Sequence, residues 1–335
     1  MPSIRDVAKL AGVSISTVSR VVSGSANVEQ TTRDRVLQVI EETGYRPNLN
    51  ARSLRSRSGQ LVGLALPKIV HDTFSTIIHH AEKEANRMGY GLIIGNTNDD
   101  PERERGFIQD LLARHVDAII FSRVSDASHL PDRVRERGLP IVVIDRGIEH
   151  DTIPSIETDN YGAGKMVANM FVQGGHRRIA TITGPQNVKL VRDRDRGFLE
   201  TLGTAGVEVL PEYHVESNFE YEGGVLAAKQ LLKLGSLPTA IWAQSDMIAV
   251  GLLKVFQAAG VRVPEDVSLV GMDNVPVSKM VTPALTSVDQ SFEEFCRRAF
   301  YIIHEQLEDP TYQPPETLVQ IPSSIVIRES FRNLT

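Results

Sequence analysis

The chain has 335 residues, of which 41% are hydrophobic and 23% are charged; this ordinary globular balance excludes an intrinsically disordered protein. A single cysteine, Cys296, excludes a disulfide framework and a cysteine-rich zinc site. No apolar run is long enough for a signal peptide or a membrane span, so we expect a cytoplasmic protein built from about two or three folding units.

The formal charge of -6 is unevenly distributed along the chain. Residues 1–60 hold nine Lys or Arg and five acidic residues, a net charge of +4, so the remainder carries -10. A small basic module on a large acidic body is typical of a phosphate-binding head on a carrier domain.

Three short helices are predicted in the first sixty residues. A capping box at Ser3–Asp6 begins the first helix, and the others are predicted over residues 15–22 and from residue 31. Each helix ends at a glycine: Gly12, Gly24 and Gly44. The β-branched residues of 15–22 would favour a strand, but the flanking glycines favour a helix. Residues 48–59 are polar and basic and, taken alone, predict a mobile linker.

From Leu61 onward, apolar strand-like runs alternate with amphipathic helices. Strands are predicted at Leu61–Pro67, Gly91–Gly95, Asp117–Phe121, Pro140–Ile144, Arg178–Thr183, Thr239–Ala243 and Ser268–Gly271. Helices are predicted near Phe74–Met88, Glu102–Ala113, Tyr161–Gln173, Tyr221–Leu234 and Met247–Ala259. This alternation predicts α/β folding with parallel sheets covered on both faces, and the length favours two lobes with a cleft between them.

The strongest local motif is a helix, a glycine-containing turn and a second helix across residues 6–21, Asp-Val-Ala-Lys-Leu-Ala-Gly-Val-Ser-Ile-Ser-Thr-Val-Ser-Arg-Val. Such a unit inserts a recognition helix into the DNA major groove, although an ordinary helical hairpin has the same pattern. With Gly44-Tyr45-Arg46-Pro47-Asn48 and Ala51-Arg52-Ser53-Leu54 after it, the stretch resembles the DNA-binding head and hinge of the lactose repressor/galactose repressor family.

The resemblance continues to the end of the chain, through motifs that fall in family order, among them Gly175-His176-Arg177-Arg178-Ile179-Ala180 and Val267-Ser268-Leu269-Val270-Gly271-Met272-Asp273-Asn274. It implies a type I periplasmic-binding-protein-like core of two lobes joined by three chain crossings, behind a helix-turn-helix head and a hinge helix. We expect the head at 1–47, the hinge at 48–59 and the core at 60–335. The N-lobe would span about 60–160 and 291–320, and the C-lobe about 161–290 and 321–335.

The resemblance also assigns DNA contacts. Ile15, Ser16 and Arg20 fall at groove-reading positions, where Arg20 can pair with guanine through two hydrogen bonds. Positions that fix the head on the DNA backbone are Ser14, Thr17, Ser19, Asn27, Thr32 and Tyr45; for those with a hydroxyl, helix capping is the alternative role. In the hinge, Leu54 occupies the family's minor-groove wedge position, with Asn48 and Ala51 beside it; a lone exposed leucine is the alternative.

Effector contacts are assigned in the same way. Phe74 and Phe219 fall at aromatic wall positions of the family's ligand cleft. Charged or polar residues at the lobe interface that can hydrogen-bond ligand hydroxyls are Asp145, Arg146, Arg194, Asp246, Asp273 and Gln290, each of which could instead belong to a surface ion pair. The family's purine sensor has an aromatic ring where Arg146 stands, which favours a polyhydroxylated ligand such as a sugar.

We therefore expect a sequence-specific transcription repressor that binds a palindromic operator as a homodimer, with a small-molecule effector between its lobes and no membrane association. No nucleophile elbow or catalytic carboxylate pair is present, so an enzyme is not expected. Neither a cofactor nor a metal is expected, since His71, His79 and His80 have no zinc-ligand partners in sequence and are interpreted as solvated. The alternatives are a catabolite-control regulator that responds to a phosphoprotein, a periplasmic binding protein and a sugar-handling enzyme.

Overall fold

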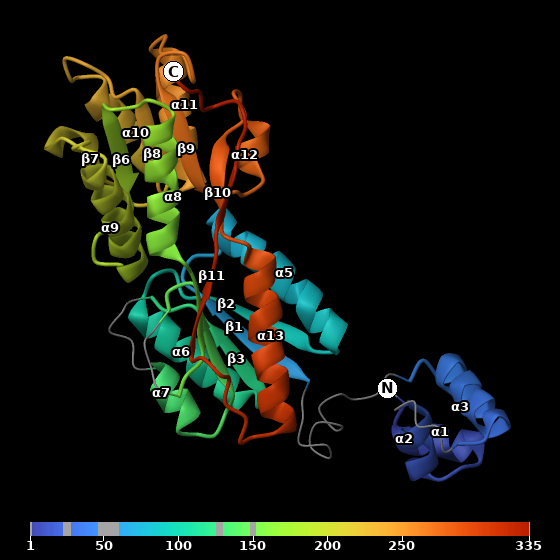
Figure 1. Ribbon diagram of the computed structural model, residues 1–335. Coiled ribbons are helices and arrows are strands. Elements are labelled where there is room, and N and C mark those ends of the chain that lie inside the picture. Colours follow the sequence, from blue (N-terminus) through green and yellow to red (C-terminus); the bar gives the residue numbers. More distant parts are fainter. Residues whose placement is uncertain (1, 23–27, 46–59, 125–129, 148–151, 335) are drawn as a thin grey trace. The chain divides into compact units, whose positions relative to one another are not determined.

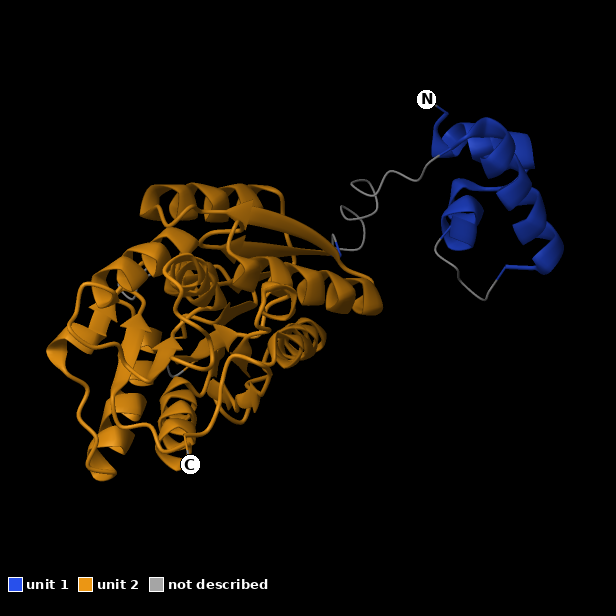
Figure 2. Cartoon of the chain, turned by 90° about the horizontal axis from the view of Figure 1, so that it is seen from above, with its two compact units in different colours: residues 1–60 blue, residues 61–335 orange. Residues whose placement is uncertain are grey.

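The computed structural model describes residues 2–22, 28–45, 60–124, 130–147 and 152–334. The chain forms two compact units, residues 1–60 and residues 61–335, coloured separately in Figure 2. Each unit has its own hydrophobic core, so each is described by itself.

The described part of the first unit contains the three predicted helices, α1 (Ile4–Ala11), α2 (Ile15–Val22) and α3 (Gln30–Thr43). The predicted capping box is formed, because the Ser3 side chain accepts from the Asp6 backbone while the Asp6 carboxylate accepts from the Ser3 backbone. Gly12 and Gly44 end α1 and α3 with φ of 65° and 62°, a conformation that disfavours residues with a Cβ. Small apolar side chains close the core: Val7, Ala8, Ala11, Val18, Val21 and Val36.

The second unit contains two sheets of six strands among its described residues (Figure 1). The first sheet has the order β11-β5-β4-β3-β1-β2 and is parallel throughout. Its strands are β1 (Leu61–Leu66), β2 (Gly91–Asn96), β3 (Ala118–Phe121), β4 (Ile141–Ile144), β5 (Ser155–Thr158) and β11 (Leu318–Ile321). Helices α5 (Asp72–Met88) and α13 (Phe292–Glu308) pack on one face, and α6 (Pro101–Ala113) and α7 (Leu130–Arg135) on the other. These elements are called the N-lobe.

The second sheet has the order β12-β10-β9-β8-β6-β7, with only the β10–β12 pair antiparallel among its described strands. Its strands are β6 (Ile179–Thr183), β7 (His214–Glu216), β8 (Ala240–Ala243), β9 (Ser268–Asp273), β10 (Thr286–Asp289) and β12 (Ser324–Val326). Helices α8 (Asn160–Gln173) and α9 (Lys189–Thr204) cover one face, and α10 (Tyr221–Leu231) and α11 (Asp246–Ala258) cover the other. With the 3-10 turn η1 (Pro211–Tyr213) and α12 (Val277–Met280), these elements are called the C-lobe.

Within the described core, the chain passes between the lobes at three places: between β5 and α8, between β10 and α13, and between β11 and β12. The sequence did not predict α7, α9, α13 or the short strands β5, β7, β10, β11 and β12. These strands have only three or four residues, and charged side chains such as Glu157 and Asp289 interrupt their apolar pattern. In α9 the charged residues between Lys189 and Arg196 likewise interrupt the apolar pattern, so the sequence did not indicate this helix.

Helices α8 and α9 approach closely because each presents a glycine to the other. A Cβ added at Gly164 of α8 would overlap the carbonyl oxygen of Arg194, and one added at Gly197 of α9 would overlap the carbonyl oxygen of Tyr161. Backbone atoms in these contacts cannot rotate away as a side chain can. The two glycines therefore fix the position of α9 and of the residues that it carries.

Gly164→Ala is expected to destabilise the second unit by about 1–3 kcal/mol, because the methyl group forces the two helices apart. Gly203→Ala on α9 is the matched control, because its methyl group would meet no atom within 4 Å. We expect that control to stabilise the helix by about 1 kcal/mol through its higher helix propensity. Urea unfolding measures both changes, and equal stability of the two variants would contradict the role given to Gly164.

Candidate functional site

Helix α2 presents a polar face away from the core of the first unit. Because successive residues are rotated by about 100° around a helix, Ile15, Ser16 and Arg20 fall on one side, opposite Val18 and Val21. The first three are exposed, with Ile15 at 37%, whereas both valines are buried. An exposed isoleucine flanked by a hydroxyl and a guanidinium offers both apolar and hydrogen-bonding contacts to a partner.

The remaining predicted DNA contacts of the head differ in exposure. Ser14 caps α2, because its hydroxyl accepts from the Thr17 backbone amide at 3.1 Å, and it also lies 2.7 Å from the Ser16 hydroxyl. Its capping role is therefore present whether or not it also contacts a phosphate. The partly buried members of the set are Thr17, Ser19, Thr32 and Tyr45. The predicted contacts Asn27, Asn48, Ala51 and Leu54 lie outside the described residues.

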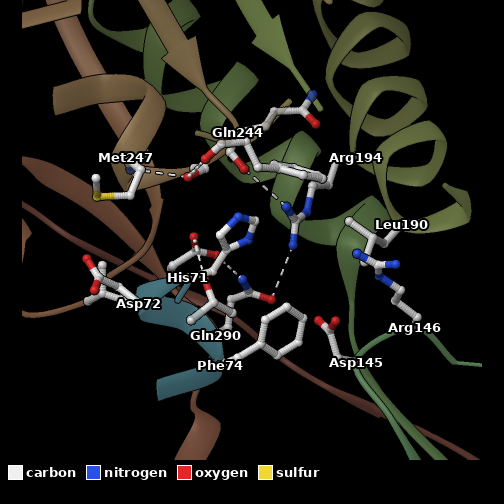
Figure 3. A pocket seen from close by; sticks show the side chains of 15 residues that line it. His71, Asp72, Phe74, Asp145, Arg146, Leu190, Arg194, Gln244, Met247 and Gln290 are labelled. Atoms are coloured by element: carbon white, nitrogen blue, oxygen red, sulfur yellow. Dashed lines mark hydrogen bonds between the residues drawn. The ribbon is translucent and has the colours of Figure 1, made fainter. Parts of the chain in front are cut away.

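A pocket that is partly open to solvent lies between the two lobes of the second unit; we call it the inter-lobe pocket (Figure 3). Seven of the eight predicted effector residues line it: Phe74, Asp145, Arg146, Arg194, Phe219, Asp273 and Gln290. The other lining residues are His71, Asp72, Thr73, Leu190, Gln244, Ser245, Met247 and Val275. The N-lobe and the C-lobe each contribute charged and aromatic groups.

Arg194, on α9, is a buried pocket residue whose guanidinium makes three hydrogen bonds. Its Nε donates to Asn160 Oδ1 at 2.8 Å, its Nη1 to the Gln244 carbonyl at 3.2 Å and its Nη2 to Gln290 Oε1 at 3.2 Å. A guanidinium has five N–H donors, so two of them are not used by these three bonds. A ligand oxygen in the pocket can accept from those donors.

Asp273 completes the network on the other side of Gln290. The Gln290 amide donates to Asp273 Oδ1, and Thr73 Oγ1 donates to Asp273 Oδ2 at 3.1 Å. Thr158 Oγ1 also donates to Gln290 Oε1, at 2.7 Å. Since Thr73 and Thr158 belong to the N-lobe and Asp273 to the C-lobe, the network joins the lobes through side chains as well as through the chain crossings.

Burial governs the ionisation of these groups. Desolvation raises the pKa of Asp273 to about 7, against the lowering effects of Arg194 and of its hydrogen bonds. Desolvation also raises the pKa of Asp145, which Arg146 and Arg194 oppose, and lowers the pKa of Arg194. The pocket therefore holds opposite charges at low dielectric, and Asp273 can both donate and accept hydrogen bonds near neutral pH.

Arg146 is fixed at one edge of the pocket by the backbone. Its Nη1 donates to the Val124 carbonyl at 2.8 Å and the Arg123 carbonyl at 3.2 Å, and lies 3.4 Å from Asp99 Oδ1. Arg146 thus lines one edge of the pocket and also forms an ion pair with the exposed Asp99, so both roles expected for it are compatible with its position.

Three pocket residues have an uncommon backbone conformation. Asp145, Phe219 and Asp273 have φ of 63°, 65° and 107°, which is unfavourable for residues other than glycine. Asp145 follows β4, Phe219 precedes α10 and Asp273 is the last residue of β9. Local strain of this kind is characteristic of functional sites, where the surrounding structure holds a side chain in a required direction.

Asp246 does not line the pocket, in contrast to its sequence-based assignment. It is fully buried in the C-lobe, where its Oδ1 accepts from Ser287 Oγ at 2.6 Å and its Oδ2 from the Val275 amide at 3.0 Å. The carboxyl group therefore joins α11 to the segments after β9 and around β10. Its pKa is raised well above the usual value by desolvation and by the nearby Asp273.

Sequence reasoning missed the other eight lining residues, of which Gln244 and His71 carry polar groups deep in the site or stacked on its aromatic wall. Gln244, at the end of β8, is fully buried and lines the pocket, and its amide nitrogen and oxygen have no partner among the described residues. His71 was interpreted as solvated, but it is partly buried and stacks on Phe74 with ring centroids 6.3 Å apart. Its position after the first predicted strand, near Phe74, was the one available signal.

The described part of the chain contains neither a metal-binding cluster nor a membrane-spanning helix. Its His, Cys, Asp and Glu residues form no group of three or more that could hold a metal ion. None of its helices is both long enough and apolar enough to cross a membrane.

Both units of the chain are similar to known proteins. Residues 3–48 match the bacterial regulatory proteins of the lacI family, and residues 168–331 match a periplasmic binding protein-like domain. The chain is 30% identical over 335 residues to the HTH-type transcriptional repressor PurR of Photobacterium profundum, covering 100% of both chains. It is 31% identical over 334 residues to the ribose operon repressor of Haemophilus influenzae, again covering 100% of both chains.

Solved structures agree with these matches. The Lac repressor dimer bound to operator and the anti-inducer ONPF matches with a TM-score of 0.86 and 25% identity, covering 98% of each chain. The complex of the transcriptional regulator CelR with cellobiose matches with a TM-score of 0.74 and 29% identity, covering 99% of this chain and 100% of that one.

A helix-turn-helix head on a two-lobed periplasmic-binding-protein-like core defines the class of effector-regulated transcriptional repressors, which are not enzymes. The chain belongs to the lacI family of bacterial regulatory proteins. The expected fold class is thereby confirmed.

Asp246→Asn is expected to change how stability depends on pH. A buried acid with a raised pKa binds its proton in the folded state at pH values where the unfolded chain has lost it, so its stabilising effect is lost as pH rises from about 4 through the folded pKa. Asparagine has no such proton, yet it can hydrogen-bond both Ser287 and Val275. From pH 5.5 to 7.5 the wild type should therefore lose stability relative to Asp246→Asn, by up to about 1.4 kcal/mol per pH unit.

Urea unfolding of both proteins at the two pH values measures this difference. Contributions of groups that do not interact with Asp246, such as His176, whose pKa is lowered by burial, cancel when the two proteins are compared at each pH. An unchanged difference in unfolding free energy between pH 5.5 and 7.5 would show that Asp246 is ionised in the folded protein throughout.

Proposed function

We propose that this protein represses transcription by binding palindromic operator DNA as a homodimer through the exposed face of α2, under the control of a sugar or sugar derivative bound in the inter-lobe pocket. The observation that carries the proposal is the pocket itself. It combines the buried Arg194–Gln290–Asp273 network with aromatic walls at Phe74 and Phe219.

The proposal of DNA binding rests on charge and exposure. Residues 1–60 carry +4 on a chain of net charge -6, which favours association with phosphates. Arg20 is exposed on the same side of α2 as Ile15 and Ser16, where a guanidinium can pair with guanine and an isoleucine can contact a thymine methyl group. A single small head reads one half-site, so a two-fold dimer is needed for a palindrome. The related Lac repressor was solved as a dimer on operator.

The hinge is proposed from family resemblance alone, because residues 46–59 lie outside the described residues. There, Leu54 would wedge into the minor groove, with Asn48 and Ala51 beside it. An inserted apolar side chain unstacks a base step, and the resulting bend allows more protein surface to contact the DNA.

The proposal of a carbohydrate effector rests on the chemistry of the pocket lining. Hydroxyl groups both donate and accept, and the two unused Arg194 donors, the carboxyl groups of Asp145 and Asp273 and the unpartnered Gln244 amide match both roles. Aromatic rings at Phe74 and Phe219 suit the apolar faces of a sugar ring. A ribose operon repressor and a regulator bound to cellobiose stand among the relatives. This lining favours a free small molecule over the phosphoprotein-dependent alternative.

Arg20→Ala should weaken binding to the operator by about 1–3 kcal/mol and relax the preference at one symmetric base pair of each half-site. The operator is first obtained by selection from random DNA, and each half-site position is then varied in gel-shift titrations. Arg35→Ala, an exposed arginine on α3, is the matched control and should leave base preference unchanged. If Arg20→Ala weakens all sequences equally, Arg20 contacts a phosphate and not a base.

Arg194→Ala and Asp273→Asn should each weaken effector binding by about 2–4 kcal/mol, because each leaves buried polar groups without a partner. Titration calorimetry is run against ribose, glucose, cellobiose, glucose 6-phosphate and adenosine. Lys83→Met, at an exposed ion pair away from the pocket, serves as the control. Equal binding of one compound to wild type and both variants would exclude these residues from its site. If the wild type binds none of the panel, the phosphoprotein-dependent alternative replaces the sugar proposal.

A further inference from the structure

Glu220 joins the two lobes beside the inter-lobe pocket. It is the N-cap residue of α10 in the C-lobe, and its Oε1 forms an ion pair with Lys68 Nζ of the N-lobe. The ring of His71, also in the N-lobe, has its Nε2 3.5 Å from the same oxygen. Lys68 and His71 both lie in the segment between β1 and α5. One carboxylate thus holds two residues of the opposite lobe.

A second ion pair joins the lobes elsewhere. Lys189 Nζ, at the first residue of α9 in the C-lobe, lies 3.6 Å from Glu157 Oε1 on β5 of the N-lobe. The same ammonium group lies 2.8 Å from Asp193 Oδ2 within α9. A cation at a helix N-terminus is unfavourable to the helix dipole, so the placement of Lys189 is explained by its acidic partners and not by helix preference.

Both pairs lie directly beside the wall of the pocket. Glu220 follows Phe219, Lys189 precedes Leu190, and His71 is itself a lining residue that stacks on Phe74; Figure 3 labels both rings. A motion that takes the segment between β1 and α5 away from Glu220 must break the first pair, and one that takes the start of α9 away from β5 must break the second. The two ion pairs therefore stabilise only the closed arrangement of the lobes. A contact that is present in one of two states shifts the equilibrium towards that state.

The two pairs are less exposed to water than an ordinary surface ion pair. The side chains of Lys68 and Glu220 are 27% and 30% exposed, and that of Glu157 is 4% exposed. By contrast, Lys83 and Glu293, both of the N-lobe, are 57% and 59% exposed. Charges that are partly removed from water attract each other more strongly, because the local dielectric is lower. The hydrogen bond from Lys68 also lowers the pKa of Glu220, which keeps this carboxylate ionised.

We propose that the Lys68–Glu220 and Lys189–Glu157 pairs form an electrostatic latch that holds the lobes closed over the pocket before any effector binds. Entry and exit of a ligand then require both pairs to open. High salt weakens the latch, because screening acts on partly exposed charges. The latch concerns lobe closure alone, so it does not depend on which ligand the pocket takes or on DNA binding.

The latch is tested by measuring the distance between spin labels on the two lobes in the full chain, without DNA or effector. Labels are attached to cysteines introduced at the exposed positions Asp110 and Glu212, one in each lobe. The native Cys296 does not compete for the label, because it is buried and its pKa is raised to about 12. Dilution with unlabelled protein removes distances between protomers.

In 0.1 M salt, Lys68→Met and Glu220→Gln should each raise the ratio of open to closed molecules about fivefold, in line with a partly buried ion pair. The double variant with Lys68→Glu and Glu220→Lys should return towards the wild-type distribution. In 1 M KCl the wild type should shift towards the open distance. Lys83→Met, which removes a pair inside one lobe, should leave the distribution unchanged.

Distance distributions of Lys68→Met and Glu220→Gln identical to that of the wild type would overturn the latch. An equal opening in Lys83→Met would also overturn it, since the effect would then follow from any lost charge. Circular dichroism of each variant establishes that it is folded before its distances are compared. A failed latch leaves the proposed function untouched, because neither operator nor effector is present in this experiment.

Discussion

Burial of the Arg194 guanidinium is the constraint on which the rest of the core depends. An arginine removed from water is tolerated only with hydrogen-bond partners and nearby opposite charge, because an unpaired buried charge is strongly destabilising. Its partners come from segments far apart in the sequence: Asn160 at the start of α8, the Gln244 carbonyl after β8 and Gln290 beside a chain crossing. The C-lobe must therefore be correctly folded, and the chain crossing after β10 in place, before the hydrogen bonds of this side chain can form.

This constraint explains several local features together. Glycines at 164 and 197 let α8 and α9 approach, which sets the position of Arg194. Positive φ angles at Asp145, Phe219 and Asp273 turn their side chains at the lobe interface, where they line the pocket. Gln290 then links the arginine to Asp273. From the N-lobe, Thr73 hydrogen-bonds Asp273 and Thr158 hydrogen-bonds Gln290. A group bound in the pocket would therefore act on contacts that control lobe separation.

Much of the fold was predictable because it depends on local chemistry. The capping box at Ser3–Asp6 and the glycines at 12 and 44 set the head helices, and the long apolar runs predicted the central strands. Short polar strands such as β5 and β12 were not predicted, because their pairing is decided by neighbours distant in sequence. At the site, Gln244 and Asp246 lie two residues apart at one strand-to-helix junction. The sequence could not tell which of the two faces the pocket, because helix rotation and lobe contact decide the direction of each side chain.

The central claim is that effector binding in the inter-lobe pocket and operator binding by the head are coupled, because each favours one of two conformational states of the protein. Such coupling is reciprocal: if an effector changes operator affinity by some factor, the operator must change effector affinity by the same factor. The most direct measurement is therefore a pair of titrations on the full chain, operator binding with and without saturating effector, and effector binding with and without operator. The account predicts a change of about 5- to 150-fold, equal in both titrations. Operator affinity that stays the same while the effector occupies the pocket would contradict it.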